Sequence, residues 1–234
     1  MYKYELHIHT SACSRCAHST IEDIILTLKK LGYTGCAITN HFYRGSTAVD
    51  RRLDWNEFVE AYENDWKIGK ALGERLDFDV LFGIEEAYLP NISKEVLIYG
   101  ITPEELKSEP KFKSFTIEQI AKFVRQHEGF LSAAHPFRIG AYNPEPTFMP
   151  DYRYFDGVEL NFGHSENRND MAEKFSKNHK LKLICGSDLH KISEPQLGST
   201  GIVVQNRIKD TKQLAKVLHS GDYKLIVNGE IRQN

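Results

Sequence analysis

Short apolar segments that end in His, Asp or Glu recur along this 234-residue chain and alternate with segments of helical period. The apolar segments have the length of buried strands, and the segments between them place apolar residues three and four positions apart. Such alternation is typical of a mainly parallel sheet with helices outside it. The polar strand ends favour a closed barrel, because barrels build their active sites at the carboxyl ends of the strands.

The elements follow from this periodicity. Strands are predicted at 4–9, 35–39, 78–84, 95–99, 130–134, 157–160 and 181–185, and helices at 20–31, 54–73, 116–128, 169–178 and 211–220, with a short strand at the end. No repeat or Gly/Ser linker divides the chain, so we expect residues 1–234 to form one domain. The aromatic residues between Trp55 and Trp66 have helical spacing and are expected to face the core rather than form a lid.

Composition narrows the class of protein. Hydrophobic content is 41%, charged content is 26% and the net charge is -2, values that are ordinary for a globular protein. With so little net charge we do not expect nucleic acid as a partner. The sequence lacks a leader-like or membrane-length apolar segment, so we expect a cytoplasmic protein with no membrane partner. The four cysteines are then expected to be thiols or metal ligands. The oligomeric state is left open.

Imidazole and carboxylate groups, which suit zinc, manganese and iron, stand at the ends of five predicted strands. Residues two apart in a strand point to the same face, so His7 and His9 can reach one ion together. Asp188 and His190 repeat this spacing, and Glu85 is expected to bridge two ions. A single His at a strand end is usually an ordinary loop residue, but their joint occurrence favours a metal site. The candidates are His7, His9, His41, Glu85, His135, Asp188 and His190.

The ordered motifs resemble the PHP (polymerase and histidinol phosphatase) family. They are His7-x-His9, Thr39-Asn40-His41, Gly83-Ile84-Glu85, His135-Pro136 and Gly186-Ser187-Asp188-Leu189-His190. The resemblance runs from about residue 4 to residue 191 and is greatest to the small, histidinol-phosphatase-like members. It implies an α/β fold, a distorted (β/α)7 barrel of TIM-like type in a single domain. It also implies two or three divalent ions (Zn, Mn or Fe) and hydrolysis of a phosphate ester by a metal-activated hydroxide.

The resemblance also implies how the ligands are shared. The first ion would be held by His7, His9, Glu85 and Asp188, the second by Glu85 and His135, and the third by His41, His190 and one residue of the loop after His9. In that loop Cys16 is our choice, because thiolate is a good zinc ligand, and His18 is the alternative. Glu86, beside the bridging Glu85, is expected at the surface.

The chain departs from the family pattern at two further positions. Many relatives have another His in the strand at 95–99, where this chain has none. The second ion is therefore expected to be bound more weakly, to be absent, or to be completed by a residue such as Asn161 or His164. Asn40 stands where relatives usually have Asp, a residue that orients the neighbouring imidazole. Asn can still form that hydrogen bond, but it carries no charge.

Arginine side chains are the expected phosphate contacts, because guanidinium grips phosphate in a two-point fork. The candidates are Arg138, which follows His135-Pro136-Phe137, then Arg44 and Arg168, with Arg15 beside the proposed metal loop. Arg138 and His190 are the expected catalytic residues. His190, or else His135, would protonate the leaving oxygen if it is not fully occupied as a ligand.

A small phosphate ester is the expected substrate, and a phosphomonoesterase is the expected activity. One alternative is a nuclease or phosphodiesterase acting on nucleic acid or nucleotides, since the family also occurs in polymerases; steeply salt-dependent binding would favour it. Another is a metal-binding domain that has lost catalysis. A third, an ordinary barrel amidohydrolase, needs a carbamylated-lysine strand that has no convincing counterpart here.

Overall fold

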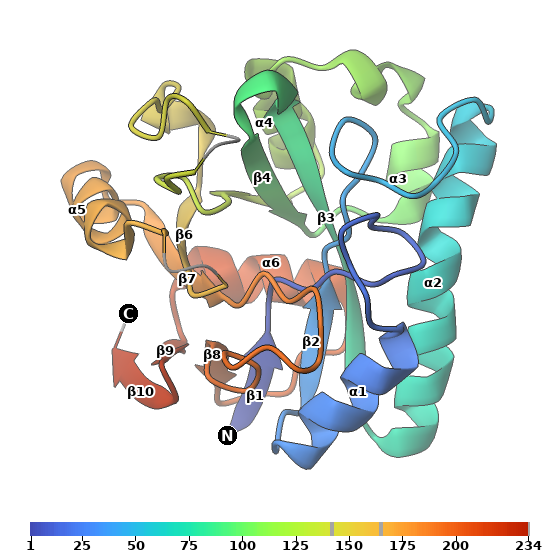
Figure 1. Ribbon diagram of the computed structural model, residues 1–234, viewed down its shortest axis with the longest axis vertical. Coiled ribbons are helices and arrows are strands. Elements are labelled where there is room, and N and C mark those ends of the chain that lie inside the picture. Colours follow the sequence, from blue (N-terminus) through green and yellow to red (C-terminus); the bar gives the residue numbers. More distant parts are fainter. Residues whose placement is uncertain (141–142, 164–165, 234) are drawn as a thin grey trace.

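Ten strands form one curled sheet in the computed structural model, which describes residues 1–140, 143–163 and 166–233 (Figure 1). The sheet order is β10-β9-β8-β1-β2-β3-β4-β5-β6-β7. The strands are β1 (Tyr2–Glu5), β2 (Gly35–Ile38), β3 (Asp79–Leu89), β4 (Lys94–Tyr99), β5 (Phe130–Ala133), β6 (Gly157–Asn161), β7 (Lys182–Gly186), β8 (Gly201–Val204), β9 (Lys224–Val227) and β10 (Glu230–Gln233).

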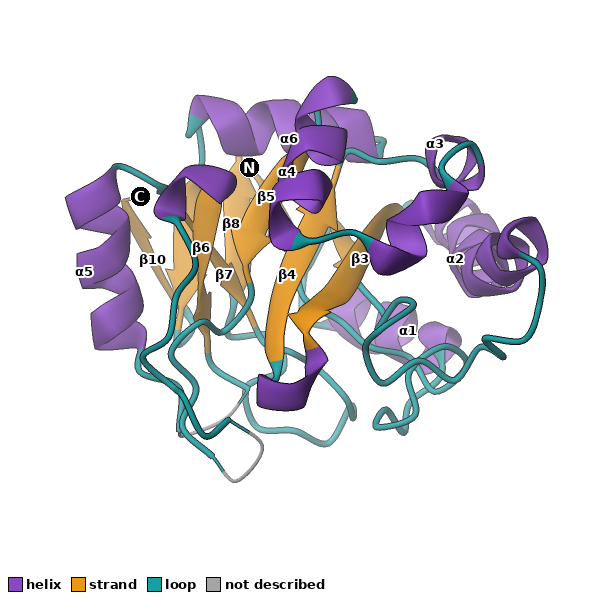
Figure 2. Cartoon of the chain, turned by 90° about the horizontal axis from the view of Figure 1, so that it is seen from above, coloured by secondary structure: helices purple, strands orange, loops and turns teal. Residues whose placement is uncertain are grey.

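Figure 2 shows helices above and beside the sheet and loops gathered along its lower edge. The helices are α1 (Ile21–Lys30), α2 (Trp55–Leu76), α3 (Pro103–Lys107), α4 (Ile117–Gln126), α5 (Asn169–His179) and α6 (Thr211–Ser220), with short 3-10 turns at Pro90–Ile92, Pro110–Ser114 and Tyr152–Tyr154. Local sequence explains their starts. Thr116 and Gln119 form the capping box that begins α4, and Thr20 accepts a hydrogen bond from the Asp23 N–H at the start of α1.

The sheet curls so that β7, at one end of the strand order, comes close to β1, the fourth strand from the other end. Beyond β1 and β7 the backbone forms a parallel bridge between Ile8 and Leu189. The His9 N–H donates to the Leu189 carbonyl at 2.9 Å, and the Leu189 N–H donates to the His7 carbonyl at 3.1 Å. This closure brings the residues that follow β1 against those that follow β7.

Three hydrophobic clusters hold the layers together. One joins the inner face of the sheet, including Leu6 and Tyr99, to Leu214 and Leu218 of α6. A second lies between the outer face and α2, α3 and α4, and the third lies under α1. Trp55 of α2 is buried in the second cluster together with Phe58 and Tyr62, as the helical spacing predicted.

Two expectations about the sheet need correction. Four of the nine described strand pairings are parallel, and β4 runs antiparallel to both β3 and β5, so the prediction of a mainly parallel sheet is wrong. The seven-strand count of the expected distorted (β/α)7 barrel is not confirmed, because the described residues form ten strands in a curled α/β sheet. The sequence reasoning also missed α3 and β8. No helix in the described residues has the length and apolar character needed to cross a membrane.

Candidate metal centre

Four predicted ligands converge beside β3, where the segments that follow β1 and β7 come together. His7, His9, Glu85 and Asp188 are buried, and one ligand atom of each lies within 4.8 Å of the others. The Nε2 atoms of His7 and His9 are 3.0 Å apart. Oδ1 of Asp188 lies 3.4 Å from the first of these nitrogens and 3.0 Å from the second.

In their neutral forms, the two imidazoles carry the ring proton on Nδ1 and leave Nε2 as the atom that can bind a metal. His7 donates from Nδ1 to Glu159 at 2.7 Å. Ser14 Oγ donates to Asn40 and accepts from the His41 N–H, so the contact of 3.1 Å between His9 Nδ1 and Ser14 Oγ requires His9 to be the donor. Two neutral imidazoles held in these tautomers present lone pairs to each other and to a carboxylate. A cation between them satisfies this donor set.

His41 and Glu85 give a second sign of the same kind. His41 Nδ1 and Glu85 Oε2 lie 2.9 Å apart, yet neither buried atom has a hydrogen-bond partner in the described residues. Buried polar atoms are rarely left in this condition. Residues of these types with converging ligand atoms fit divalent ions.

Glu95 of β4 joins the cluster, and the sequence reasoning missed it. Its carboxylate lies 3.4 Å from His41 Nδ1 and 3.5 Å from His135 Nε2, and its side chain is 12% exposed. His135 Nε2 is also 2.9 Å from Glu85. Asn161, one of the two residues expected here, bonds instead to Gly163, Asn167 and Glu159. The other, His164, lies outside the described residues.

At the other end of the cluster, Cys16 faces His190. The distance from Sγ to His190 Nε2 is 3.1 Å, while His190 Nδ1 lies 2.7 Å from the Asp188 carbonyl. Burial raises the pKa of Cys16, but hydrogen bonds from His190 and His41 outweigh it and lower that pKa to about 6. His18 is exposed and contributes its backbone N–H to the His190 carbonyl. Of the two loop candidates, the structure brings Cys16 to the cluster.

Two buried carboxylates behind the ligands were also missed. Glu159 of β6 accepts from His7 Nδ1 and from the His135 N–H at 2.8 Å. Gly186 permits this approach, because a Cβ there would lie 2.5 Å from Glu159 Oε1. Glu5 accepts from the backbone N–H groups of His7 and Ser187. Acidic residues inside predicted strands gave the only sequence signal for either.

Asn40 reaches the candidate ligand His9 through Ser14, and a residue of α2 lies beside it. Its Oδ1 accepts from the Thr10 N–H and from Ser14, which in turn holds His9. Asp65 of α2 accepts from Thr10 Oγ1 at 2.5 Å and from Asn40 Nδ2 at 3.4 Å. A buried carboxylate of α2 therefore lies beside Asn40.

The backbone is strained at two candidate ligands. His135 has φ 26° and Asp188 has φ 54°, values that side chains other than glycine rarely adopt. Such residues cost about 1–3 kcal/mol each and gather at functional sites.

The carboxylates around the candidate ligands, Glu85, Glu95, Glu159 and Asp188, outnumber the permanently charged cation beside them, Arg138. Burial alone would lower the pKa of His7, but Glu159, Glu85 and Asp188 outweigh it and raise that pKa well above its ordinary value. Burial and the charges of His41 and His190 lower the pKa of His9 to about 4. The field of the carboxylates thus attracts positive charge to the centre.

Two of the predicted phosphate contacts are already paired. Arg138 is 24% exposed, and its Nη2 pairs with Asp188 while Nε donates to Asn167. Arg44 donates from Nε to Glu86 at 2.8 Å, and its buried Nη2 lacks a partner in the described residues. Glu86 is buried, which corrects its expected surface position, because loop residue Arg44 pairs with it on the outer side of β3.

The other two arginines lie in exposed positions. Arg168 is 47% exposed and pairs with Asp170, in the manner of an ordinary surface ion pair. Arg15 donates its backbone N–H to Ser46 and is exposed.

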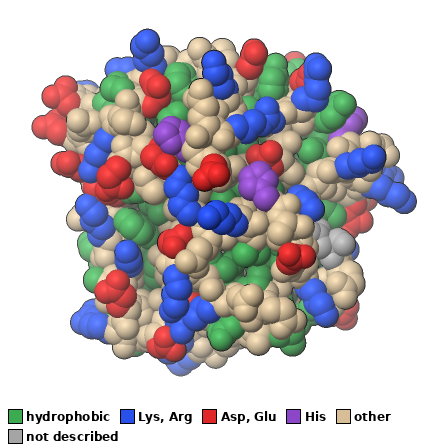
Figure 3. Space-filling model, turned by 180° about the vertical axis from the view of Figure 1, so that it is seen from behind, with side chains coloured by type: hydrophobic (Ala, Val, Ile, Leu, Met, Phe, Trp, Pro, Cys, Tyr) green, Lys and Arg blue, Asp and Glu red, His purple; other side chains and the backbone are tan. Residues whose placement is uncertain are grey.

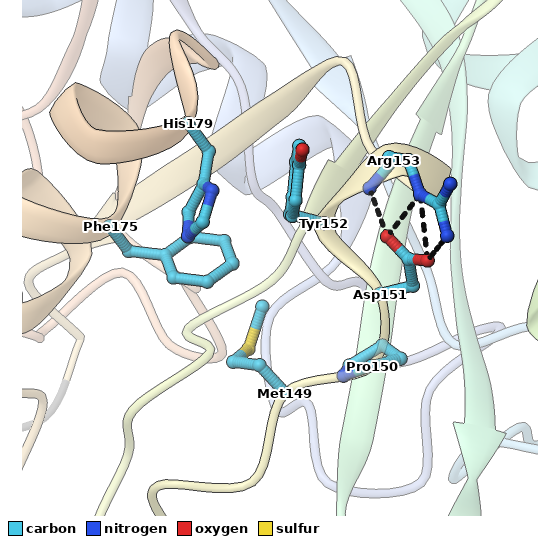
Figure 4. Close-up of a pocket in the computed structure, with 7 residues that line it drawn as sticks. All are labelled: Met149, Pro150, Asp151, Tyr152, Arg153, Phe175 and His179. Carbon is cyan, nitrogen blue, oxygen red and sulfur yellow. Dashed lines mark hydrogen bonds and ion pairs between the residues drawn. The ribbon is translucent and has the colours of Figure 1, made fainter.

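A surface hollow of about 570 Å³ lies away from these ligands, between residues 149–153 and α5 (Figure 4). In Figure 4 Tyr152, Phe175 and His179 gather on one side, and Asp151 pairs with Arg153 on the other. The ring centroids of Tyr152 and His179 are 4.1 Å apart. None of the cluster residues lines this hollow.

No protein-family model and no curated protein matches this sequence. Solved structures do. A two-domain protein of Bacteroides vulgatus containing a predicted PHP-like metal-dependent phosphoesterase is 13% identical, with a TM-score of 0.68 over 98% of this chain and 66% of that one. Endonuclease Q of Pyrococcus furiosus is 16% identical, with a TM-score of 0.63 over 96% of this chain and 57% of that one. A Bifidobacterium adolescentis protein proposed to be a metal-dependent phosphoesterase is 14% identical, with a TM-score of 0.58 over 92% and 95%.

The chain therefore spans just under two thirds of the first structure and little more than half of the second. Another endonuclease Q structure, 14% identical with a TM-score of 0.62 over 94% of this chain and 56% of that one, holds a 27-mer duplex with an abasic lesion at its active site. Our expectation that nucleic acid is not a partner is not supported. The fold of this chain is the one found in PHP-like metal-dependent phosphoesterases and in endonuclease Q.

Proposed function

We propose that this protein is a metal-dependent phosphoesterase with two or three divalent ions, zinc, manganese or iron, in the buried cluster. The observation that carries the proposal is the convergence of buried ligand atoms of His7, His9, Glu85 and Asp188. The PHP-like fold of its structural neighbours supports the same chemistry.

The proposed ligands divide as the sequence predicts. The first ion is assigned to His7, His9, Glu85 and Asp188, the second to Glu85 and His135, and the third to His41, His190 and Cys16. Ions bound there would supply Lewis-acid activation of the phosphoryl group and of a water molecule.

Protein side chains position the reactants around this centre. Arg138 pairs with Asp188 and its side chain is 24% exposed, which supports a role in holding a phosphoryl oxygen. The nitrogens of His190 face the Asp188 carbonyl and Cys16, an arrangement that favours a ligand over a proton donor. We keep Arg44 as a proposed phosphate contact because of its unpartnered buried nitrogen, and we give Arg168 the lowest rank.

A small phosphomonoester is the proposed substrate, and histidinol phosphate is the first compound to assay. The competing function is a nuclease or phosphodiesterase, favoured by the endonuclease Q neighbours. Lys and Arg are interspersed with Asp and Glu on the face shown in Figure 3, without the single-sign surface that long polyanions prefer.

The test is turnover by the metal-loaded protein on three substrates: a phosphomonoester, a phosphodiester and a duplex containing an abasic site. We expect the monoester to be preferred and the activity to be lost in Asp188→Ala. Preference for the duplex, with binding that weakens steeply as salt rises, would establish the nuclease instead. Metal binding without turnover on any of the three would indicate a catalytically inactive domain.

A further inference from the structure

Glu95 places a second carboxylate at one end of the metal cluster. Side chains alternate along β4, so Glu95 points inward with Leu97 and Tyr99, which pack in the inner hydrophobic cluster. The carbonyl of Glu95 accepts from the Ala134 N–H at 3.1 Å, which fixes the backbone beside His135. The carboxylates of Glu85 and Glu95 therefore face the same two imidazoles, His41 and His135.

Cys16 places a sulfur at the opposite end. The loop that carries it is fixed by a bridge between Ser14 and Thr47 and by the Arg15 N–H, which donates to Ser46. Within this loop Sγ is held 3.1 Å from His190 Nε2. His41 contacts both ends, because it also interacts with Cys16.

These two ends offer chemically different donors. Thiolate with imidazole is a soft set that selects zinc, whereas paired carboxylates are a hard set that suits manganese. Zinc binds more tightly than manganese to most sites. A site built from hard donors is therefore the one at which manganese competes with zinc most effectively.

We propose that the centre is a mixed one, in which Cys16, His41 and His190 hold zinc while Glu95 acts as a ligand with Glu85 and His135 at a site that takes manganese. This inference rests on the proposed metal centre and adds both the Glu95 ligand and the partition of the metals.

Elemental analysis tests the partition. Protein stripped of metal receives one equivalent of zinc and an excess of manganese, is passed through a desalting column, and is analysed for both elements. We expect wild-type protein to retain both. Cys16→Ser should retain about tenfold less zinc, with its manganese content unchanged. Glu95→Gln should retain about tenfold less manganese, with its zinc content unchanged. Loss of a direct ligand is expected to reduce metal affinity at least as much as loss of a supporting residue does. Glu95→His should exchange manganese for zinc when zinc is no longer limiting.

Cobalt absorption gives a readout that does not depend on activity. Cobalt bound to Cys16 should give a thiolate-to-metal charge-transfer band that is lost in Cys16→Ser and kept in Glu95→Gln. Cys13→Ser is the matched control, because this buried neighbour donates to the Tyr62 carbonyl, where a hydroxyl can replace it. Circular dichroism checks that each variant is folded.

The outcomes separate the inference from the proposed function. If both variants lose the two metals in parallel, or the cobalt band survives in Cys16→Ser, the mixed centre is wrong although a metal-dependent phosphoesterase remains. If wild-type protein retains less than one metal ion per chain of any kind, the proposed function itself fails.

Discussion

Glu159 holds two residues of the candidate metal centre, His7 and His135, from behind. Its carboxylate binds His7 Nδ1, the His135 N–H and the Asn161 amide, and its side chain is buried. By accepting a hydrogen bond from His7 Nδ1, it directs His7 Nε2 toward Glu85 and Asp188. The ligand set therefore depends on a residue that the strand-end pattern does not reveal.

We predict that Glu159→Gln weakens metal binding about 10–100-fold, because an amide holds the imidazole tautomer less firmly than a carboxylate does. Competition with a chromophoric chelator measures the affinity. Glu173→Gln, on the exposed side of α5, is the control and should leave it unchanged. Equal affinity in Glu159→Gln and wild-type protein would show that the buried carboxylate does not support the site.

Some residues of the site could be read from the sequence and others could not. Spacing of two residues in a strand reveals His7 with His9, and Asp188 with His190. Glu95 was not predicted as a site residue, because the rule that sites form at the carboxyl ends of strands applies to parallel strands. In the antiparallel β4 the amino end meets the cluster.

The direction of β4 follows from the length of its connection to β3. Only four residues, 90–93, separate the two strands. A parallel neighbour requires a crossover of a dozen or more residues, so this short connection can only turn the chain back. The strand at 95–99 was predicted correctly in place, and its short distance from Glu85 contained the signal for its direction. β8 gave less warning, because its four residues follow no predicted helix.

Glu63 joins α2 to α3 and gives a prediction at the scale of elements. Its buried carboxylate accepts from Lys67 and from Lys107 of α3, each at 2.8 Å. Burial raises the pKa of Glu63, but these two lysines outweigh it and lower that pKa below the ordinary value. The ionised carboxylate therefore stabilises the fold at neutral pH, and this contribution disappears as pH falls through the lowered pKa.

We expect Glu63→Gln to reduce the free energy of unfolding by about 1–2 kcal/mol at pH 7. The difference from wild-type protein should shrink as pH falls below the ordinary Glu pKa. Urea denaturation at several pH values measures it, with the exposed Glu74→Gln of the same helix as control. A difference that stays constant down to acid pH would contradict an electrostatic role for Glu63.

At the scale of the molecule, the candidate centre ties together strands that are distant in sequence. Its ligands come from the ends of β1 and β7, from β3 and from the residue after Ala134, at the point where the sheet closes. The chain must be folded to assemble them, so metal binding adds directly to the free energy of unfolding.

We predict that metal at about 100 times its dissociation constant stabilises the protein by about 2.7 kcal/mol for each ion bound. For a chain of this length that corresponds to a rise in Tm of roughly 5–10 °C. Differential scanning calorimetry with and without chelator measures the shift. Asp188→Ala should show a much smaller one, and an equal shift in both proteins would mean that the metal binds elsewhere.

We propose that the cluster is a multi-ion catalytic centre. The most direct measurement is elemental analysis of protein purified without chelator, combined with a phosphatase assay of the same sample and of Asp188→Ala. We predict two or more divalent ions per chain in wild-type protein, and both fewer ions and no turnover in the variant. Fewer than one ion per chain after addition of zinc, manganese or iron would contradict the claim, as would turnover that survives in Asp188→Ala.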